Sequence, residues 1–227
     1  MSAASQLGNP RLHLRLTDST NERAKELARG GAPHGTLVTA DEQSAGRGRQ
    51  GRSWAAPARS ALLMSVVVRE PTETLPLTAA VAVCDACEPL PCRIKWPNDV
   101  WVERRKLAGI LVEGRPQEGW AVLGIGLNVS SSPPDLPATH LLEHDPQAGH
   151  ESTLARLLRA LDERLGAPGS EMLAAWRERD ALRDERVRWE GGEGTASGID
   201  DSGALLVETA GGSVALHAGE VHLKLPD

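Results

Sequence analysis

A short run rich in glycine and arginine, residues 46–54, constrains the fold of this chain more than any other feature. Its sequence is GRGRQGRSW, and the glycine spacing matches the G-x-G-x-x-G fingerprint of dinucleotide-binding proteins. That fingerprint requires a strand before the run and a helix that begins within it. Pro57 follows closely, and residues 61–68 (ALLMSVVV) have the apolar, β-branched composition of a strand. We therefore reject a dinucleotide-binding fold and predict a loop between two strands.

The side chains of this loop indicate that it binds an anion. Arg47, Arg49 and Arg52 present a fork geometry suited to carboxylate and phosphate oxygens. The glycines let backbone N–H groups approach a ligand closely, and Trp54 has a ring that can stack on a flat group. The alternative is a solvated basic turn. A formal net charge of −6 argues against a nucleic-acid surface, so we expect a small anion as the ligand.

Length and composition set broad limits on the protein. The 227 residues suffice for one large domain, or for a main domain with a small appendage. No apolar run approaches the roughly 20 residues of a membrane-spanning helix, and the first residues lack the apolar core of a signal peptide. We therefore expect a cytoplasmic protein without membrane contact. Because the chain has neither Phe nor Tyr, aromatic contacts in a site must come from its six tryptophans or from a histidine.

Two patterns resemble metal sites but have simpler interpretations. Cys84, Cys87 and Cys92 have a spacing that metal and redox sites also use, yet they lie in an apolar helical stretch where cysteine is often a small buried hydrophobe. Residues 140–144 (HLLEH) match a zinc-protease pattern, H-x-x-E-H. The surrounding prolines leave room for little more than one helical turn, whereas that chemistry needs a stable helix. We therefore predict buried thiols and no metal site.

The remaining patterns predict an α+β fold with a mixed β-sheet flanked by helices. Strands are expected at 11–16, 36–40, 61–68, 94–96, 100–102, 106–113 and 120–129, and helices at 22–29, 75–88, 153–165 and 171–180. Residues 130–151 are proline-rich and should form a loop. From residue 186, five short strands separated by glycine turns favour a small β-barrel. We therefore expect a main domain over 1–182 and a small domain over 183–227.

The polar candidates for a site lie at strand ends and in loops, where sites are usually built. They are Ser19, Thr20, Asn21, Gln43, Arg47, Arg49, Arg52, Asn98, Asp99, Lys106 and Asn128. The set contains cations and neutral hydrogen-bonding groups but no evident nucleophile–base pair, and the chain lacks a G-x-S-x-G elbow and a Walker motif. Such a set suits a reaction that holds two anions together, as in the adenylation of a carboxylate by ATP.

Several motifs together resemble one family, the biotin protein ligases. Residues 46–54 resemble the family's G-R-G-R-x-G-R-x-W loop, and residues 95–99 (KWPND) followed by 105–111 (RKLAGIL) are similar to its K-W-P-N-D and R-K-L-A-G-I-L blocks. Residues 19–21 (STN) and 124–129 (GIGLNV) match two further elements, and 198–200 with 219–221 resemble its C-terminal barrel. The resemblance implies the family's fold, a catalytic domain like that of class II aminoacyl-tRNA synthetases with an SH3-like barrel.

The resemblance also implies the reaction, which forms biotinyl-AMP from biotin and ATP and then transfers biotin to a lysine of a carrier protein. By position, the biotin contacts would be Ser19, Thr20, Asn21, Gln43, Arg47, Gly48, Arg49, Lys106 and Gly109. The nucleotide contacts would be Arg49, Arg52, Trp54, Asn98, Asp99 and Asn128. The catalytic residues would be Lys106, Arg47 and Arg49. Mg²⁺ is implied by the ATP chemistry, although no protein cage for it can be recognised. The partner would be the biotin carboxyl carrier protein of acetyl-CoA carboxylase or a similar carboxylase.

The chain also departs from the family pattern. Only eighteen residues precede Ser19, too few for the DNA-binding domain of bifunctional members, so we expect no repressor activity. Lys224 stands where an arginine is common, which would give a point charge instead of a fork. A homodimer is possible. Two alternatives stay open, namely a lipoate or octanoate transferase, which shares the fold, and a non-catalytic biotin or nucleotide sensor.

Overall fold

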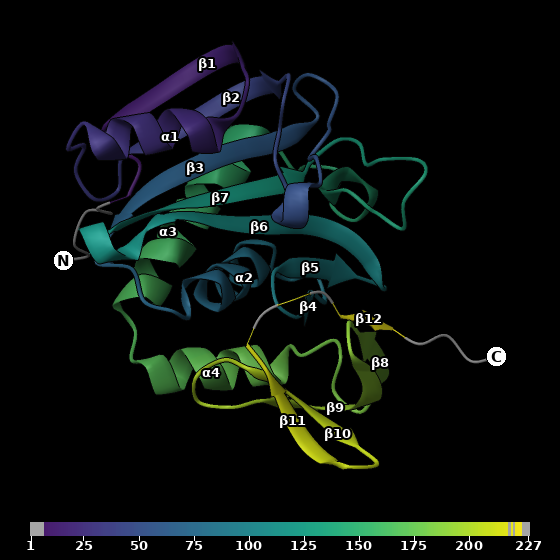
Figure 1. Cartoon of the computed structure of the whole chain (residues 1–227). Coiled ribbons are helices and arrows are strands. Elements are labelled where there is room, and N and C mark those ends of the chain that lie inside the picture. The colour runs from purple at the N-terminus through teal and green to yellow at the C-terminus, as the bar shows by residue number, and fades with distance from the viewer. Residues whose placement is uncertain (1–6, 218, 220, 224–227) are drawn as a thin grey trace.

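A seven-stranded mixed sheet forms the centre of the computed structural model, which describes residues 7–217, 219 and 221–223 (Figure 1). In sheet order the strands are β1 (Arg11–Thr17), β2 (Leu37–Gln43), β3 (Ala61–Arg69), β7 (Trp120–Asn128), β6 (Arg105–Arg115), β5 (Asp99–Val102) and β4 (Arg93–Lys95). β1 and β2 are parallel because α1 (Thr20–Arg29) connects them, and the other neighbours are antiparallel. The mixed sheet predicted from the sequence is confirmed.

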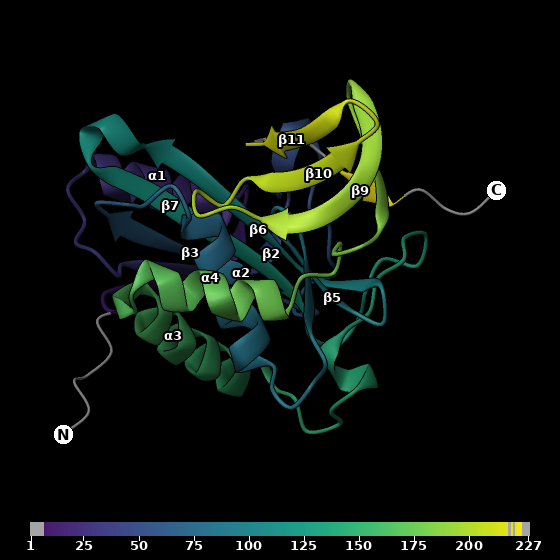
Figure 2. The same ribbon diagram turned by 90° about the horizontal axis from the view of Figure 1, so that it is seen from below.

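Helices cover the two faces of this sheet unequally (Figures 1 and 2). α1 lies on one face, where its Ala24 and Ala28 pack in a small cluster with Trp120. The opposite face carries α2 (Leu75–Ala86), α3 (His150–Gly166) and α4 (Gly169–Glu178) over the main core. α2 is apolar nearly all round because it is enclosed between the sheet and the other two helices. The face with α1 is therefore the one left open for a site.

The C-terminal part forms a second, antiparallel sheet. Its strands are β8 (Arg186–Trp189), β9 (Gly192–Ile199), β10 (Leu205–Thr209), β11 (Gly212–Leu216) and β12 (His222–Leu223), in the order β11-β10-β9-β8-β12. All five segments predicted as strands are strands. Within the described residues β11 and β12 remain the two edges, so the expected barrel is an open sheet here. Val187, Leu205 and Val207 are buried in the main core cluster.

The structure shows the surroundings of the three cysteines and of the HLLEH pattern, the two sequence patterns that resemble metal sites. Cys84, Cys87 and Cys92 are free thiols buried in the core, as predicted. Between the two histidines of the HLLEH pattern, Leu141–Glu143 form only a single 3₁₀ turn, so the stable helix of a zinc protease is missing there. In the described part of the chain, no group of three or more His, Cys, Asp or Glu side chains could hold a metal ion. No helix in that part is long and apolar enough to cross a membrane.

Candidate active site

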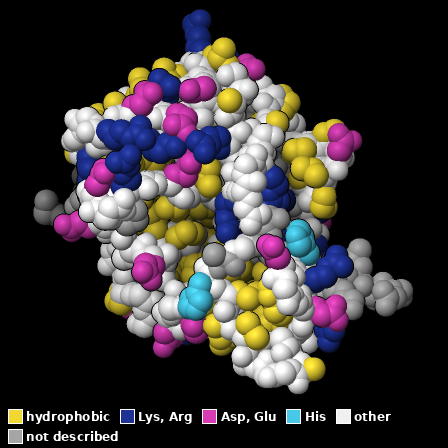
Figure 3. All heavy atoms as spheres, in the orientation of Figure 1, with side chains coloured by type: hydrophobic (Ala, Val, Ile, Leu, Met, Phe, Trp, Pro, Cys, Tyr) yellow, Lys and Arg dark blue, Asp and Glu magenta, His cyan; other side chains and the backbone are white. Residues whose placement is uncertain are grey.

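A cavity of about 670 Å³ opens on the α1 face of the sheet. It lies over β6 and β7, between the start of α1, the glycine–arginine loop of residues 46–54, and residues 131–138. Figure 3 shows this hollow near the centre of the molecule, with apolar side chains at its bottom and Lys and Arg side chains gathered along its upper edge. All the polar candidates predicted from the sequence line this one cavity.

One end of the cavity is built by the first residues of α1. Gln43, at the end of β2, accepts hydrogen bonds at Oε1 from the backbone N (2.7 Å) and Oγ1 (3.0 Å) of Thr20. Gln43 therefore satisfies the first N–H group of the helix. Ser19 occupies the N-cap position but makes no side-chain capping bond, and it lines the cavity. Its role in binding stays a prediction.

Asn21 is held rigidly at the same end of the cavity. Its Nδ2 donates to Glu113 Oε2 (2.9 Å), and its Oδ1 accepts from Ser65 Oγ (2.6 Å). Both partners come from the sheet below, and Asn21 is only 4% exposed. Gly124 on β7 makes this packing possible, because a Cβ at that position would lie 2.1 Å from Asn21 Oδ1. The bare backbone at Gly124 therefore admits Asn21 to the sheet surface.

The middle of the cavity has a floor of glycine. Gly109 on β6 and Gly126 on β7 are paired across the sheet, and the Trp54 ring lies on them. A Cβ on Gly126 would meet this ring at 2.4 Å. The ammonium group of Lys106 lies 5.6 Å from the centroid of the same ring, within cation–π range. Trp54 is thus held between the glycine floor and a cation.

The loop itself contains no α-helix. Arg47 and Ser53 form an isolated antiparallel bridge, and only a 3₁₀ turn at Arg49–Gly51 interrupts the extended backbone. The rejection of a dinucleotide-binding fold is therefore confirmed. The loop is also tied to the C-terminal sheet region, because Arg49 donates from Nη2 to the carbonyl of Gly219 (3.2 Å) and from Nη1 to Asn98 Oδ1 (3.2 Å).

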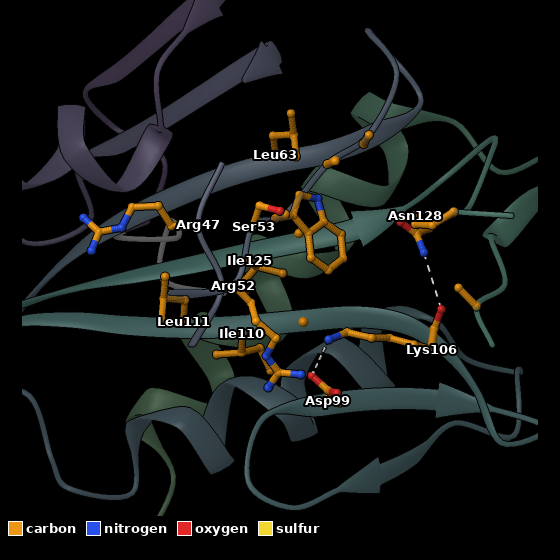
Figure 4. Close-up of a pocket in the computed structure, with 18 of the residues that line it drawn as sticks. Arg47, Arg52, Ser53, Leu63, Asp99, Lys106, Ile110, Leu111, Ile125 and Asn128 are labelled. Atoms are coloured by element: carbon orange, nitrogen blue, oxygen red, sulfur yellow. Dashed lines mark hydrogen bonds and ion pairs between the residues drawn. The ribbon is translucent and has the colours of Figure 1, made fainter. Parts of the chain in front are cut away.

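The other end of the cavity is strongly cationic. Lys106 pairs with Asp99 at 2.7 Å (Figure 4), and Arg49, Arg52 and Lys95 line the same end. Burial lowers the pKa of Lys95, and the positive charges of Lys106 and two arginines lower it further, whereas Asp99 opposes the shift. Burial also lowers the pKa of Arg49 from its usual value. An excess of cations around one carboxylate is suited to a polyanionic ligand.

Replacing Lys95 with methionine is expected to stabilise the protein. The folded-state pKa of Lys95 is lowered, so its charged form opposes folding below that pKa, and this penalty fades as pH rises towards the unfolded value. The gain in Tm for Lys95→Met should thus be largest near neutral pH and shrink as the pH rises towards the ordinary pKa of lysine. A gain of about 1 kcal/mol corresponds to about 2–4 °C for a chain of this size. Thermal melts across this pH range, with the exposed Arg115→Met as control, test the sign.

Not every predicted residue lies where its role suggests. The Arg47 side chain lies towards α1, away from Lys106 and Asp99 (Figure 4), and it pairs with Glu22 and Glu113. Asn128 is buried, and its Nδ2 donates to the carbonyls of Thr139 (3.0 Å) and Lys106 (3.4 Å). Asn128 therefore holds the 131–138 segment next to β6. Glu220 and Lys224, noted in the sequence, lie outside the described residues.

Three residues, one that lines the cavity and two that contact Asn21 in its wall, had no role in the sequence-based prediction. Lys95 lines the cavity and is the first residue of the K-W-P-N-D motif, so the motif could have identified it as a site residue. Ser65 is a lone polar residue in an apolar strand and bonds to both Thr20 (2.8 Å) and Asn21. Glu113 lies two residues beyond the second motif block on β6, and no sequence pattern indicated its contact with Asn21.

Comparison with known proteins assigns the class. Residues 13–130 match the model of the biotin/lipoate A/B protein ligase family, and residues 185–224 match that of the biotin protein ligase C-terminal domain. The fold and the cavity thus define a protein ligase of the biotin/lipoate class.

Individual relatives narrow this class. The chain is 40% identical to the biotin–[acetyl-CoA-carboxylase] ligase of Mycobacterium tuberculosis, over 92% of this chain and 87% of the relative. It is 34% identical to the enzyme of the same name from Paracoccus denitrificans, over 92% and 98%. The structure of the Aquifex aeolicus biotin protein ligase in complex with biotin and ATP matches with a TM-score of 0.83 at 28% identity, over 95% and 99%. The chain belongs to the biotin protein ligase family.

Proposed function

We propose that the cavity over β6 and β7 carries out both steps of protein biotinylation. One observation carries this proposal: the cavity joins a neutral hydrogen-bonding end, at Ser19–Asn21 and Gln43, to a cationic end at Lys106 and Arg49. A neutral ring system with a carboxylate tail fits the first end, and the phosphates of ATP fit the second. The tail then meets the α-phosphate in the middle, next to Lys106.

In the first step, a carboxylate oxygen of biotin attacks the α-phosphorus of ATP, and the bond to the leaving pyrophosphate breaks. Lys106 and Arg49 are placed to reduce the repulsion between the two anions and to stabilise the charge that develops. Trp54 on its glycine floor is suited to cover the adenylate and to exclude water. In the second step, a lysine amine of the carrier attacks the acyl carbon, AMP leaves, and the amine loses a proton.

Mg²⁺ would enter with the nucleotide. Asp99 is the one carboxylate among the described residues that line the cavity, and Asn98 lies beside it. This donor set fits Mg²⁺, which usually binds through one or two carboxylates together with substrate phosphates and water. Asp99 would hold the ion, which would offset phosphate charge, and Lys106 would compete for the same carboxylate.

We propose a biotin carboxyl carrier protein as the acceptor, because the relatives from Mycobacterium tuberculosis and Paracoccus denitrificans are biotin–[acetyl-CoA-carboxylase] ligases. We also propose that the chain divides near residue 183 into the two predicted domains. The C-terminal match begins at residue 185, and the second sheet begins at Arg186. The small domain would help to place the loop, because Gly219 accepts from Arg49.

The test is ATP–pyrophosphate exchange with the purified protein, comparing biotin, lipoate, octanoate and no acid. We expect exchange that requires biotin. Exchange with lipoate or octanoate alone would indicate a lipoate or octanoate transferase instead of a biotin ligase. Biotin binding without any exchange would indicate a sensor, although Lys106 and Arg49 form a charge set that a sensor does not need.

Arg49→Gly is expected to release biotinyl-AMP before transfer. Arg49 connects the loop to Asn98 and to the Gly219 carbonyl, so its loss frees the loop that covers the adenylate. Released adenylate would acylate lysines on bystander proteins, which mass spectrometry detects as scattered biotinylation. A variant that modifies only the carrier lysine, as the unmodified enzyme should, would contradict this role of Arg49.

A further inference from the structure

Four charged side chains from three separate elements meet beside the Asn21 end of the cavity. Glu22 and Lys25 come from α1, Glu113 from β6, and Arg47 from the glycine–arginine loop; we refer to them as the charge cluster. Lys25 Nζ lies 2.7 Å from Glu22 Oε1 and 3.3 Å from Glu113 Oε1, and Arg47 Nη2 lies 3.3 Å from the same Glu113 oxygen. Arg47 also donates to Glu22. Two cations and two carboxylates thus balance one another.

Glu113 has two different functions within this cluster. Its Oε1 faces the cations Lys25 and Arg47, whereas its Oε2 accepts from Asn21 Nδ2 at 2.9 Å. The opposite side of the Asn21 amide is fixed by Ser65, whose hydroxyl donates to Oδ1. A flipped amide would place its oxygen against the Glu113 carboxylate, which cannot donate when ionised. Asn21 Nδ2 also donates to the Leu111 carbonyl, at the longer distance of 3.4 Å, so Glu113 is the nearer of the two acceptors that fix the orientation of the Asn21 amide.

Burial distinguishes the Lys25–Glu113 pair of this cluster from an ordinary surface ion pair, whereas the Arg47 side chain is 48% exposed. The side chains of Lys25 and Glu113 are 11% and 19% exposed, whereas the Arg23–Glu26 pair on the same helix is 36% and 53% exposed. Exposed pairs contribute little, because water screens them and the side chains lose entropy. The Glu113 carboxylate is less exposed to water, so its interactions are screened less. It contacts Asn21 in the cavity wall and Arg47 in the glycine–arginine loop.

We propose that Glu113 is a positioning residue that links the Asn21 amide to the placement of Arg47 and its loop. The inference rests on the proposed function, since it assigns Asn21 to biotin and the loop to the adenylate. One carboxylate thereby sets both the hydrogen-bonding pattern offered to biotin and the anchor of the loop. A change at Glu113 should consequently affect biotin recognition and adenylate retention together, while a change at Glu22 should affect only retention.

Three variants separate these two effects. Glu113→Gln keeps an acceptor oxygen for Asn21 but loses the charge that holds Arg47 and Lys25. Glu22→Gln weakens the anchor of Arg47 and leaves the Asn21 contacts intact. Glu113→Ala removes both functions. Glu26→Gln is the matched control, because Glu26 pairs with Arg23 on the same helix.

The measurements are the KM for biotin and the kcat in ATP–pyrophosphate exchange, together with the rate of biotinyl-AMP release. For Glu113→Ala we expect biotin KM to rise at least about tenfold, equivalent to about 1.4 kcal/mol, with faster release. Glu113→Gln should restore biotin KM to within about threefold of wild type but still release the adenylate quickly, as Glu22→Gln should. Near-isosteric Glu113→Gln guards against a folding artefact, and thermal melts check all variants.

The outcomes separate this inference from the proposed function. Suppose that the wild-type protein shows biotin-dependent exchange, and that Glu113→Ala has the same biotin KM and the same rate of biotinyl-AMP release as Glu26→Gln. The proposed role of Glu113 is then wrong, whereas the proposed function is supported. If Glu113→Gln fails to restore KM, the amide-orienting role is wrong. If the wild-type protein shows no biotin-dependent exchange, the proposed function and this inference both fail.

Discussion

Lys106→Ala is expected to slow formation of biotinyl-AMP by about 10²–10³ while leaving the fold intact. Lys106 lies at the junction of the two ends of the cavity, 2.7 Å from Asp99 and over the Trp54 ring. Removing its charge leaves the biotin carboxylate and the α-phosphate to repel each other and leaves Asp99 without its partner. The loss of one positioned electrostatic group typically costs about 10²–10³ in kcat. The measurement is ATP–pyrophosphate exchange with biotin at saturating ATP.

Two comparisons sharpen the Lys106 experiment. Lys106→Gln retains much of the side-chain length without the charge and should be almost as inactive as the alanine variant. Arg115→Ala removes an exposed cation from the end of the same strand and should behave as wild type. Near wild-type exchange by Lys106→Ala would show that the cationic end of the cavity is not where the adenylate forms.

Gly124→Ala is expected to lose biotin affinity by about 10–100-fold, the effect of one or two hydrogen bonds made in a buried site. The added Cβ would lie 2.1 Å from Asn21 Oδ1, so Asn21 must leave its place between Ser65 and Glu113. Overpacking of this kind also destabilises the fold, typically by about 1–3 kcal/mol. Titration calorimetry with biotin and a thermal melt would measure both effects.

Gly166→Ala is the matched control for this substitution. A Cβ at Gly166 would meet nothing within 4 Å, so both biotin affinity and Tm should be nearly unchanged. If Gly124→Ala lost stability but bound biotin as wild type does, Asn21 would be a structural residue only. The pattern would then assign biotin recognition to Ser19, Thr20 and Gln43 alone.

The secondary structure was largely predictable because hydrophobic periodicity and glycine–proline breaks are local signals. Helix ends were less predictable: α1 begins at Thr20, because Gln43 supplies the acceptor for its first N–H group from another strand. Whether the five short strands close into a barrel could not be predicted from the sequence either, because they have the same residue pattern in an open sheet. These differences arise from contacts between residues far apart in the sequence.

The membership of the site was predictable from motifs, but its internal contacts were not. Ser65, Gly124 and Leu111 lie side by side across β3, β7 and β6, and this register admits Asn21 from α1. Strand order is not a local property, so neither the contact with Ser65 nor that with Glu113 could be inferred. The direction of the Arg47 side chain likewise depends on two carboxylates, one on a helix and one on a strand.

The placement of Trp54 on bare backbone gives the protein a built-in optical probe. Without tyrosine, its near-ultraviolet emission comes from tryptophan alone, and Trp54 lies where a nucleotide would have to pass or settle. Adenine stacking on the indole, or movement of Lys106 away from it, would change the emission at that site. Trp176, fully buried in the core, would report unfolding instead. Ligand entry and loss of the fold can therefore be followed in one unlabelled sample, by comparing the protein with its Trp54→Leu variant.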